Sequence, residues 1–109
     1  MTATPVILRA LAQQDVEEAI DSYLGEKAAK AALTFVDALE AALRHIGAHP
    51  ATGSPRYAHE LGLPGLRCWP LKRHPLLVYY VEQPDHIDVW RVLHGRRDLP
   101  AWLSEPAAD

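Results

Sequence analysis

Residues 65–98 read GLRCWPLKRHPLLVYYVEQPDHIDVWRVLHGRRD and are the part of the sequence most informative about the fold. β-Branched and aromatic residues dominate three runs, at 66–71, 76–82 and 86–94, which predicts three strands. The residues between them, 72–75 and 83–85, are links of turn length. Strands joined so closely should pair antiparallel, because a parallel return needs a crossover of about a dozen residues or more.

Two amphipathic helices are predicted ahead of these strands. Asp15 stands at the position of a helix N-cap, with Glu18 three residues later as in a capping box. Apolar residues recur at helical spacing from Val16 to Leu24, and Gly25 should end this helix. A longer helix is predicted over residues 27–46, ended by Gly47. Its apolar stripe consists of Ala28, Ala32, Phe35, Leu39, Ala42, Leu43 and Ile46.

The remaining segments complete one small domain. Residues 5–11 form a mostly apolar run that can serve as a first strand, and residues 47–65 are a loop rich in Gly and Pro with a short helical turn near 57–61. The short link between the helices predicts an antiparallel αα-hairpin. We therefore expect residues 1–109 to form a single α+β domain of two layers, with this hairpin packed on a curved antiparallel β-sheet. The tail from about residue 104 should be loose.

Charge is distributed unevenly along the chain, whose net charge is −3. Residues 1–50 hold four basic and seven acidic side chains, whereas residues 56–97 hold seven basic and four acidic ones. This excess is small for a protein that grips nucleic acid through phosphates, so no direct DNA binding is expected. A local basic patch for one acidic partner fits the pattern better.

Composition also bounds the compartment. No run approaches the ~20 apolar residues that span a bilayer, and the first residues lack the pattern of a signal peptide. Cys68 is the single cysteine, so no internal disulfide can form. We therefore expect a cytoplasmic protein without a membrane partner.

Four motifs in order suggest a family. They are ALAQQDVEEAIDSYL at 10–24, HPATGSP at 49–55, GLPGLRCWPLKRHPLLVYYVE at 62–82 and IDVWRVLHGRRD at 87–98. Together, over roughly residues 5–98, the chain resembles the RelE/ParE superfamily of toxins from type II toxin–antitoxin systems. The resemblance implies a helical hairpin on an antiparallel sheet and a cognate antitoxin as partner.

Function within this superfamily divides by chemistry. RelE-like members cut mRNA on the ribosome, and they resemble one another in an arginine that opens an Arg-Leu-Val-Tyr-like run on the third strand. Here that position is Leu76, and His94 is followed by Gly95 where those members tend to carry an aromatic residue. The ParE branch lacks the catalytic set and binds DNA gyrase. The resemblance therefore favours a ParE-like toxin that binds its target and needs no cofactor. A ribosome-dependent mRNA endoribonuclease, or a degenerate toxin that retains only antitoxin binding, are the alternatives.

The candidate residues are mostly cations of the strand region. Those predicted to contact the target or antitoxin are Arg67, Arg73, Arg91, His94, Arg96 and Arg97. In the nuclease alternative Arg91 and His94 would be catalytic, although three residues apart on a strand they point to opposite faces unless a bulge intervenes. For this pair the plain alternative is a solvated arginine and a structural histidine. For Arg67, Arg73, Arg96 and Arg97 it is solvated hairpin ends, where cations discourage edge-to-edge pairing.

A metal site is not expected. His45 and His49 have a spacing that occurs in metal sites, but Gly47 separates them and no acidic or sulfur ligand is obviously near.

Overall fold

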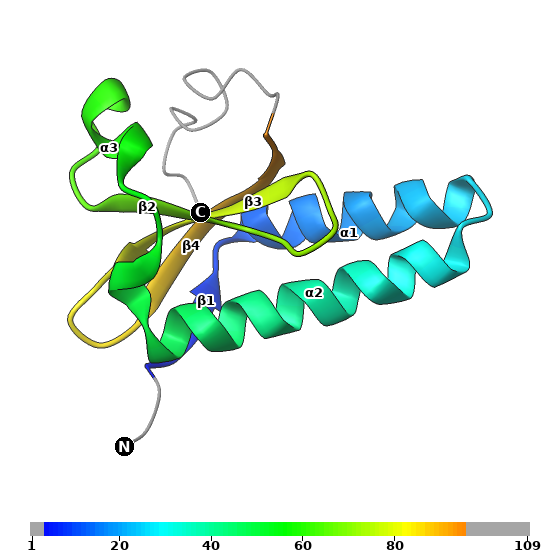
Figure 1. Cartoon of the computed structure of the whole chain (residues 1–109), viewed down its shortest axis with the longest axis horizontal. Helices are drawn as coiled ribbons and strands as arrows, with labels where there is room; N and C mark the ends of the chain where they lie inside the picture. The colour runs from blue at the N-terminus through cyan, green and yellow to red at the C-terminus, as the bar shows by residue number, and fades with distance from the viewer. Residues whose placement is uncertain (1–3, 96–109) are drawn as a thin grey trace.

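The computed structural model describes residues 4–95 and has two main layers. Helices α1 (Ala10–Gly25) and α2 (Ala29–Ala48) form an antiparallel hairpin against one face of a four-stranded sheet (Figure 1). The strands are β1 (Val6–Leu8), β2 (Leu66–Pro70), β3 (Leu76–Glu82) and β4 (Ile87–His94). The predicted α+β architecture is confirmed.

The sheet has the strand order β1-β4-β3-β2. Strands β2, β3 and β4 pair antiparallel, as the short links predict. Strand β1, shorter than the expected run over 5–11, pairs with β4 in parallel, so the sheet as a whole is mixed. A parallel pairing is possible here because both helices and two strands lie between β1 and β4 in the chain.

Both helices differ from the sequence prediction, α1 at its start and α2 by two residues at each end. Helix α1 begins at Ala10, so Asp15 is no N-cap but lies buried within the helix. Helix α2 continues through Gly47 to Ala48, because a glycine inside a helix costs only about 1 kcal/mol. Gly47 is buried, and its carbonyl accepts a hydrogen bond from the Thr4 N–H at 3.1 Å. The predicted stop at Gly47 was therefore wrong, and the residue marks where the chain ahead of β1 meets α2.

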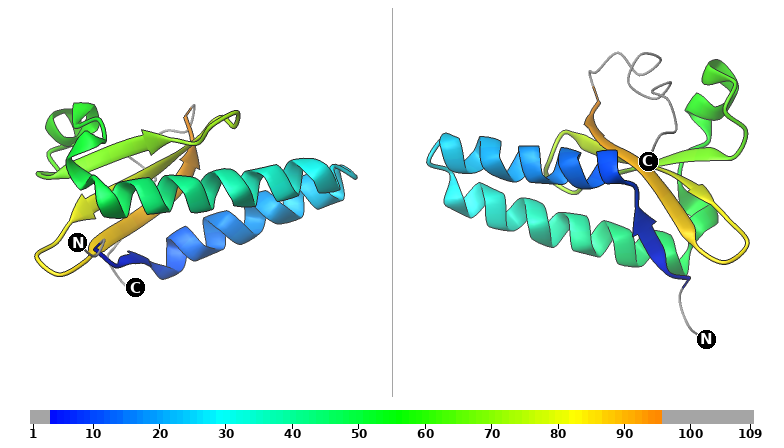
Figure 2. Two further views of the ribbon diagram at one scale, coloured as in Figure 1. Left: turned by 60° about the horizontal axis from the view of Figure 1, so that its bottom comes forward. Right: turned by 180° about the vertical axis from the view of Figure 1, so that it is seen from behind.

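Apolar side chains pack on both faces of the sheet. The larger cluster lies under the helical hairpin and includes Phe35, Ile46, Val78 and Tyr80. The smaller one lies on the other face beneath the short helix α3 (Arg56–Leu61), which follows a 3-10 turn at Pro50–Thr52 (Figure 2). Alternate residues of β2 and β3 serve the two clusters, as strand geometry requires.

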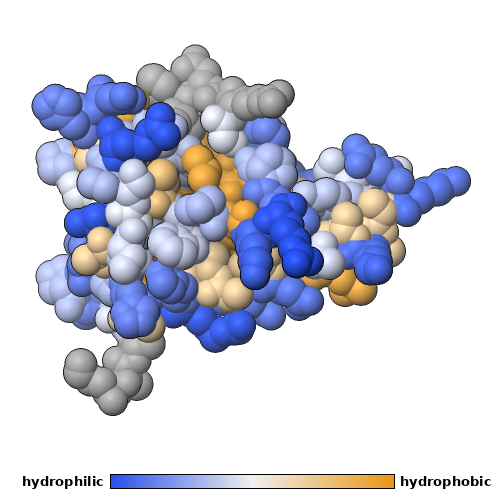
Figure 3. All heavy atoms as spheres, in the orientation of Figure 1, coloured by the Kyte–Doolittle hydropathy of each residue, from blue (hydrophilic) through white to orange (hydrophobic). Residues whose placement is uncertain are grey.

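Strand β4 carries an irregularity in the middle of the sheet. Tyr79 is paired with Arg91 and Tyr80 with Val89, which leaves Trp90 as an extra residue on β4. Such a bulge redirects the side chains that follow it. None of the described helices is long and apolar enough to cross a membrane. Hydrophilic residues cover most of the surface in Figure 3, and hydrophobic ones gather near the middle of that face.

Candidate functional site

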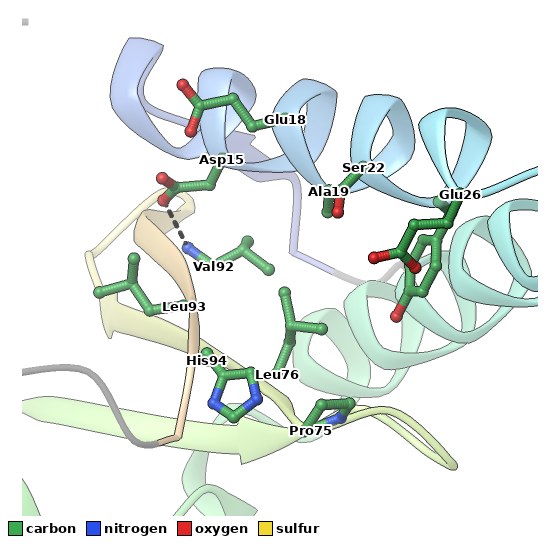
Figure 4. Close-up of a pocket in the computed structure, with 11 residues that line it drawn as sticks. Asp15, Glu18, Ala19, Ser22, Glu26, Pro75, Leu76, Val92, Leu93 and His94 are labelled. Atoms are coloured by element: carbon green, nitrogen blue, oxygen red, sulfur yellow. Dashed lines mark hydrogen bonds between the residues drawn. The ribbon is translucent and has the colours of Figure 1, made fainter.

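Arg91 lies in a buried ion pair that ties β4 to α1. Its Nε and Nη2 each donate to the Asp15 carboxylate at 2.8 Å, and the Val92 backbone N–H donates to the same carboxylate at 3.0 Å (dashed in Figure 4). Strand β1 pairs with β4 only as far as Val89. Beyond that point the Asp15 carboxylate, rather than a neighbouring strand, accepts a hydrogen bond from the β4 backbone. The interpretation of Arg91 as a solvated arginine is wrong, because both side chains are buried.

His94 lies apart from this ion pair. The pairing of β4 with β3 is regular from Arg91 to His94, so no bulge intervenes and the two side chains belong to opposite faces of the strand. Leu76 is the residue directly across from His94 on β3. At the position where the RelE-like pattern has an arginine, the imidazole therefore meets an aliphatic neighbour.

The cavity beside His94 is a groove between α1 and the adjoining ends of β3 and β4, with a volume of about 290 Å³. Helix α1 forms one wall and the two strands form the floor (Figure 4). The lining residues of the helix are Asp15, Glu18, Ala19, Ser22, Tyr23 and Glu26. Those of the strands and the turn before β3 are Pro75, Leu76, Val92, Leu93 and His94. The groove is acidic because Asp15, Glu18 and Glu26 line it. The sequence analysis instead predicted a basic contact site on the strands.

The loop after α2 is built around Tyr80. Its buried hydroxyl donates to the Pro50 carbonyl at 2.7 Å and accepts from the Gly53 N–H at 3.1 Å. A Cβ on Gly53 would collide with this hydroxyl, which explains the glycine of the HPATGSP motif. Arg67 also serves the loop, since its Nη1 donates to the Gly53 carbonyl at 2.8 Å. Burial raises the pKa of Tyr80, so the hydroxyl stays protonated as a donor.

The other predicted contact residues are spread over the molecule. Arg73 is exposed in the β2–β3 turn, in a left-handed backbone conformation with φ of 67°. Arg96 and Arg97 lie outside the described residues. The structure therefore does not bring the predicted cations together at one place within residues 4–95.

The side chains with reactive or metal-binding potential have structural surroundings. His45 stacks on Trp69 with ring centroids 4.1 Å apart, and its Nε2 is hydrogen bonded to Thr52 at 2.9 Å. Within residues 4–95, no three potential ligands are grouped as a metal site would need. Cys68 is buried, and desolvation raises the pKa of its thiol, which opposes formation of a nucleophilic thiolate.

Sequence reasoning missed the roles of Asp15 and Tyr80. A signal for Asp15 was present, since it shares a helical face with Ala12 and Ala19, where a lone carboxylate requires a buried partner. For Tyr80, nothing in the local sequence points to Pro50 as a hydrogen-bond partner. The acidic groove depends on α1 and β4 coming together, so it had no local signal.

Comparison with known proteins defines the class and then the family. The fold is similar to that of a chain of the chromosomal ParDE TA system from P. aeruginosa, with a TM-score of 0.70 and 18% identity. The match covers 84% of this chain and 96% of that one. No curated protein matches. The model of the family described as "ParE toxin of type II toxin-antitoxin system, parDE" matches residues 6–99. The chain belongs to this ParE toxin family.

Proposed function

We propose that this chain inhibits bacterial growth by binding DNA gyrase in the cytoplasm, and that a cognate antitoxin neutralises it. The observation that carries the proposal is the family match over residues 6–99, which includes both layers of the fold. Such an activity needs a binding surface and no cofactor.

The surroundings of Arg91 and His94 favour binding over catalysis. RNA cleavage needs groups that converge on one phosphate to move protons and stabilise charge. Arg91 is neutralised by Asp15, and His94 lies on the other face of the strand beside Leu76. A nuclease built on this pair would have to break a buried ion pair first.

Exposed cations offer the contact surface for an acidic region of the target. Arg73 projects from the β2–β3 turn next to exposed Lys72, and Arg96 and Arg97 follow β4 in sequence. Guanidinium groups suit carboxylates because they can donate two parallel hydrogen bonds. Arg67 and Arg91 have structural partners, so we assign them to stability rather than to contact.

The test is expression of the chain alone, followed by a supercoiling assay with purified gyrase. We expect growth arrest with DNA damage signalling, loss of supercoiling in vitro, and relief of both by the antitoxin. Arg73→Gln should weaken inhibition by about tenfold, the loss expected from one charge-assisted contact. Lys30→Gln is the matched control, because Lys30 is an exposed cation of helix α2 and lies outside the β2–β3 turn.

Two other results would replace the proposal. Cleavage of cellular mRNA between codon positions, mapped by primer extension after a pulse of expression, would identify a ribosome-dependent nuclease. Normal growth together with a stable antitoxin complex would identify a degenerate toxin. Growth arrest while gyrase remains fully active at saturating toxin would remove gyrase as the target.

A further inference from the structure

The groove beneath α1 owes its space to small side chains. Positions 15, 19, 22 and 26 recur at helical spacing on the face of α1 that lies over the strands. Ala19 and Ser22 occupy the middle of this face, where larger residues would fill the space above Leu76 and Val92 (Figure 4). The groove is therefore open along the helix and has an apolar floor formed by Leu76 and Val92.

The rim of the groove is acidic. Glu18 is exposed on α1, and Glu26 is exposed at the C-cap directly after the helix, about 12 Å further along its axis at about 1.5 Å per residue. Glu18 accepts a hydrogen bond from the neutral Gln14 side chain at 3.1 Å, so its charge is not compensated there. Among the described lining residues neither lysine nor arginine occurs.

Two further polar groups of the groove already have partners. Asp15 is paired with Arg91, and the Tyr23 hydroxyl shares a hydrogen bond with His74 Nδ1 at 3.0 Å. The two glutamates therefore supply the charge available to a ligand. A ligand that complements this groove needs an aliphatic stem for Leu76 and Val92 and a cationic end for a carboxylate. Arginine and lysine side chains have both parts.

We propose that the groove anchors a cationic side chain, arginine above all, of the cognate antitoxin. The inference rests on the proposed function for the identity of the partner. Arginine is preferred to lysine because its weakly hydrated guanidinium loses less on entering a partly apolar groove. We assign the groove to the antitoxin rather than to the target. The exposed cation Arg73 is assigned above to an acidic region of the target, whereas this acidic groove requires a basic partner surface.

The first test uses the purified chain and N-acetyl-arginine amide, followed by NMR of the backbone amides. We expect saturable shifts at Ala19, Val92 and Leu93, and none with N-acetyl-citrulline amide, which has the same shape without the charge. Glu18→Gln combined with Glu26→Gln should weaken binding at least about tenfold, as loss of a charge-assisted hydrogen bond predicts. Equal shifts from both probes would overturn the proposal.

The matched control removes the same charge from the same helix. Glu17 and Asp21 are exposed on α1 and do not line the groove. Glu17→Gln combined with Asp21→Asn should bind the arginine probe as the unchanged chain does. If this variant loses as much affinity as the groove variant, the probe responds to net charge alone, and the groove is not a site.

The second test identifies the occupant in the purified toxin–antitoxin complex. N-acetyl-arginine amide should no longer shift the groove amides, because the antitoxin fills the groove. Undiminished shifts in the complex would exclude the antitoxin as occupant. Both tests are independent of toxicity, so a chain that binds the probe but does not arrest growth would refute the proposed function and leave the cation site standing.

Discussion

Two arginine–aspartate pairs connect the N-terminal part of the chain to β4, and they differ in their access to solvent. In the pair Arg91–Asp15 the exposed fractions of the side chains are 8% and 6%, and in the pair Arg9–Asp88 they are 27% and 15%. Both are bidentate, with N–O distances between 2.8 and 3.0 Å. The two pairs therefore differ in burial and not in distance, and we expect the buried pair to contribute more to the free energy of unfolding.

The surroundings sharpen the contrast. Asp15 also accepts the Val92 N–H, so the buried pair closes the edge of β4 beyond β1. Asp88 instead accepts from the Trp90 indole at 3.1 Å, and Arg9 lies over that ring with its Cζ 4.6 Å from the centroid. The second pair is therefore held against an aromatic surface at the boundary with water.

The largest expected effect is that of Asp15→Ala. It leaves the Arg91 guanidinium buried without its counter-charge, which costs about 3–5 kcal/mol of the free energy of unfolding. Urea denaturation measures this loss. Asp21→Ala, on the exposed face of the same helix, should change stability by no more than about 0.5 kcal/mol. A similar loss in both variants would mean that the buried pair has no special weight.

Arg91→Lys should be the next in size. Lysine keeps the charge but cannot donate from two nitrogens of a planar fork, so we expect a loss of about 1–3 kcal/mol. Arg9→Lys is the counterpart in the exposed pair and should be nearly neutral. If the two substitutions destabilise the fold equally by thermal and urea denaturation, the contrast in burial does not govern the pairs.

Arg9→Ala should cost about 1 kcal/mol. Measured pairs near the surface give about 0.2–1 kcal/mol, and the contact with Trp90 adds a cation–π contribution of similar size. A double-mutant cycle with Trp90→Leu separates the two contributions. A coupling of zero between Arg9 and Trp90 would assign the whole effect to Asp88.

Salt should produce the smallest effect. At about 1 M salt the Debye length is near 3 Å, so the difference in stability between the unchanged chain and Arg9→Ala should shrink. The difference for Asp15→Ala should persist, because the buried pair is largely shielded from ions. Urea denaturation of both variants at low and high salt measures the two differences in stability. If both differences shrink equally with salt, the buried pair is not shielded as expected.

Sequence patterns predicted the parts of the fold that local chemistry determines. The stripe from Ala32 to Ile46 is buried at the helical periodicity. The run Leu76–Glu82 forms the predicted strand, and Val78, Tyr79 and Tyr80 are buried in succession because both faces of the sheet are covered. The short links required antiparallel pairing of β2, β3 and β4, which is confirmed. The three-residue strand β1 pairs in parallel with a strand about 80 residues away, and no local signal specifies that.

The candidate site was harder to predict, because charge alone does not reveal a partner. Arg67, Arg73 and Arg91 look alike in the sequence but have different environments in the structure. Arg67 donates to a loop carbonyl, Arg73 lies in an exposed turn, and Arg91 pairs with a buried carboxylate. Asp15 fitted the pattern of a helix cap equally well. Only the approach of α1 to β4 distinguishes these environments, and it joins residues 76 positions apart.

The pairing of β1 with β4 constrains when the protein can fold as it is made. Residues Val6–Leu8 leave the ribosome early, but their partners Ile87–Val89 emerge only about 80 residues later. Because synthesis proceeds at about 5–20 residues per second, the N-terminal strand and Asp15 wait for several seconds without their partners. The sheet of this ParE toxin family member can therefore close only after translation has reached Val89, so β1 is one of the first elements to be made and one of the last to be fixed in place.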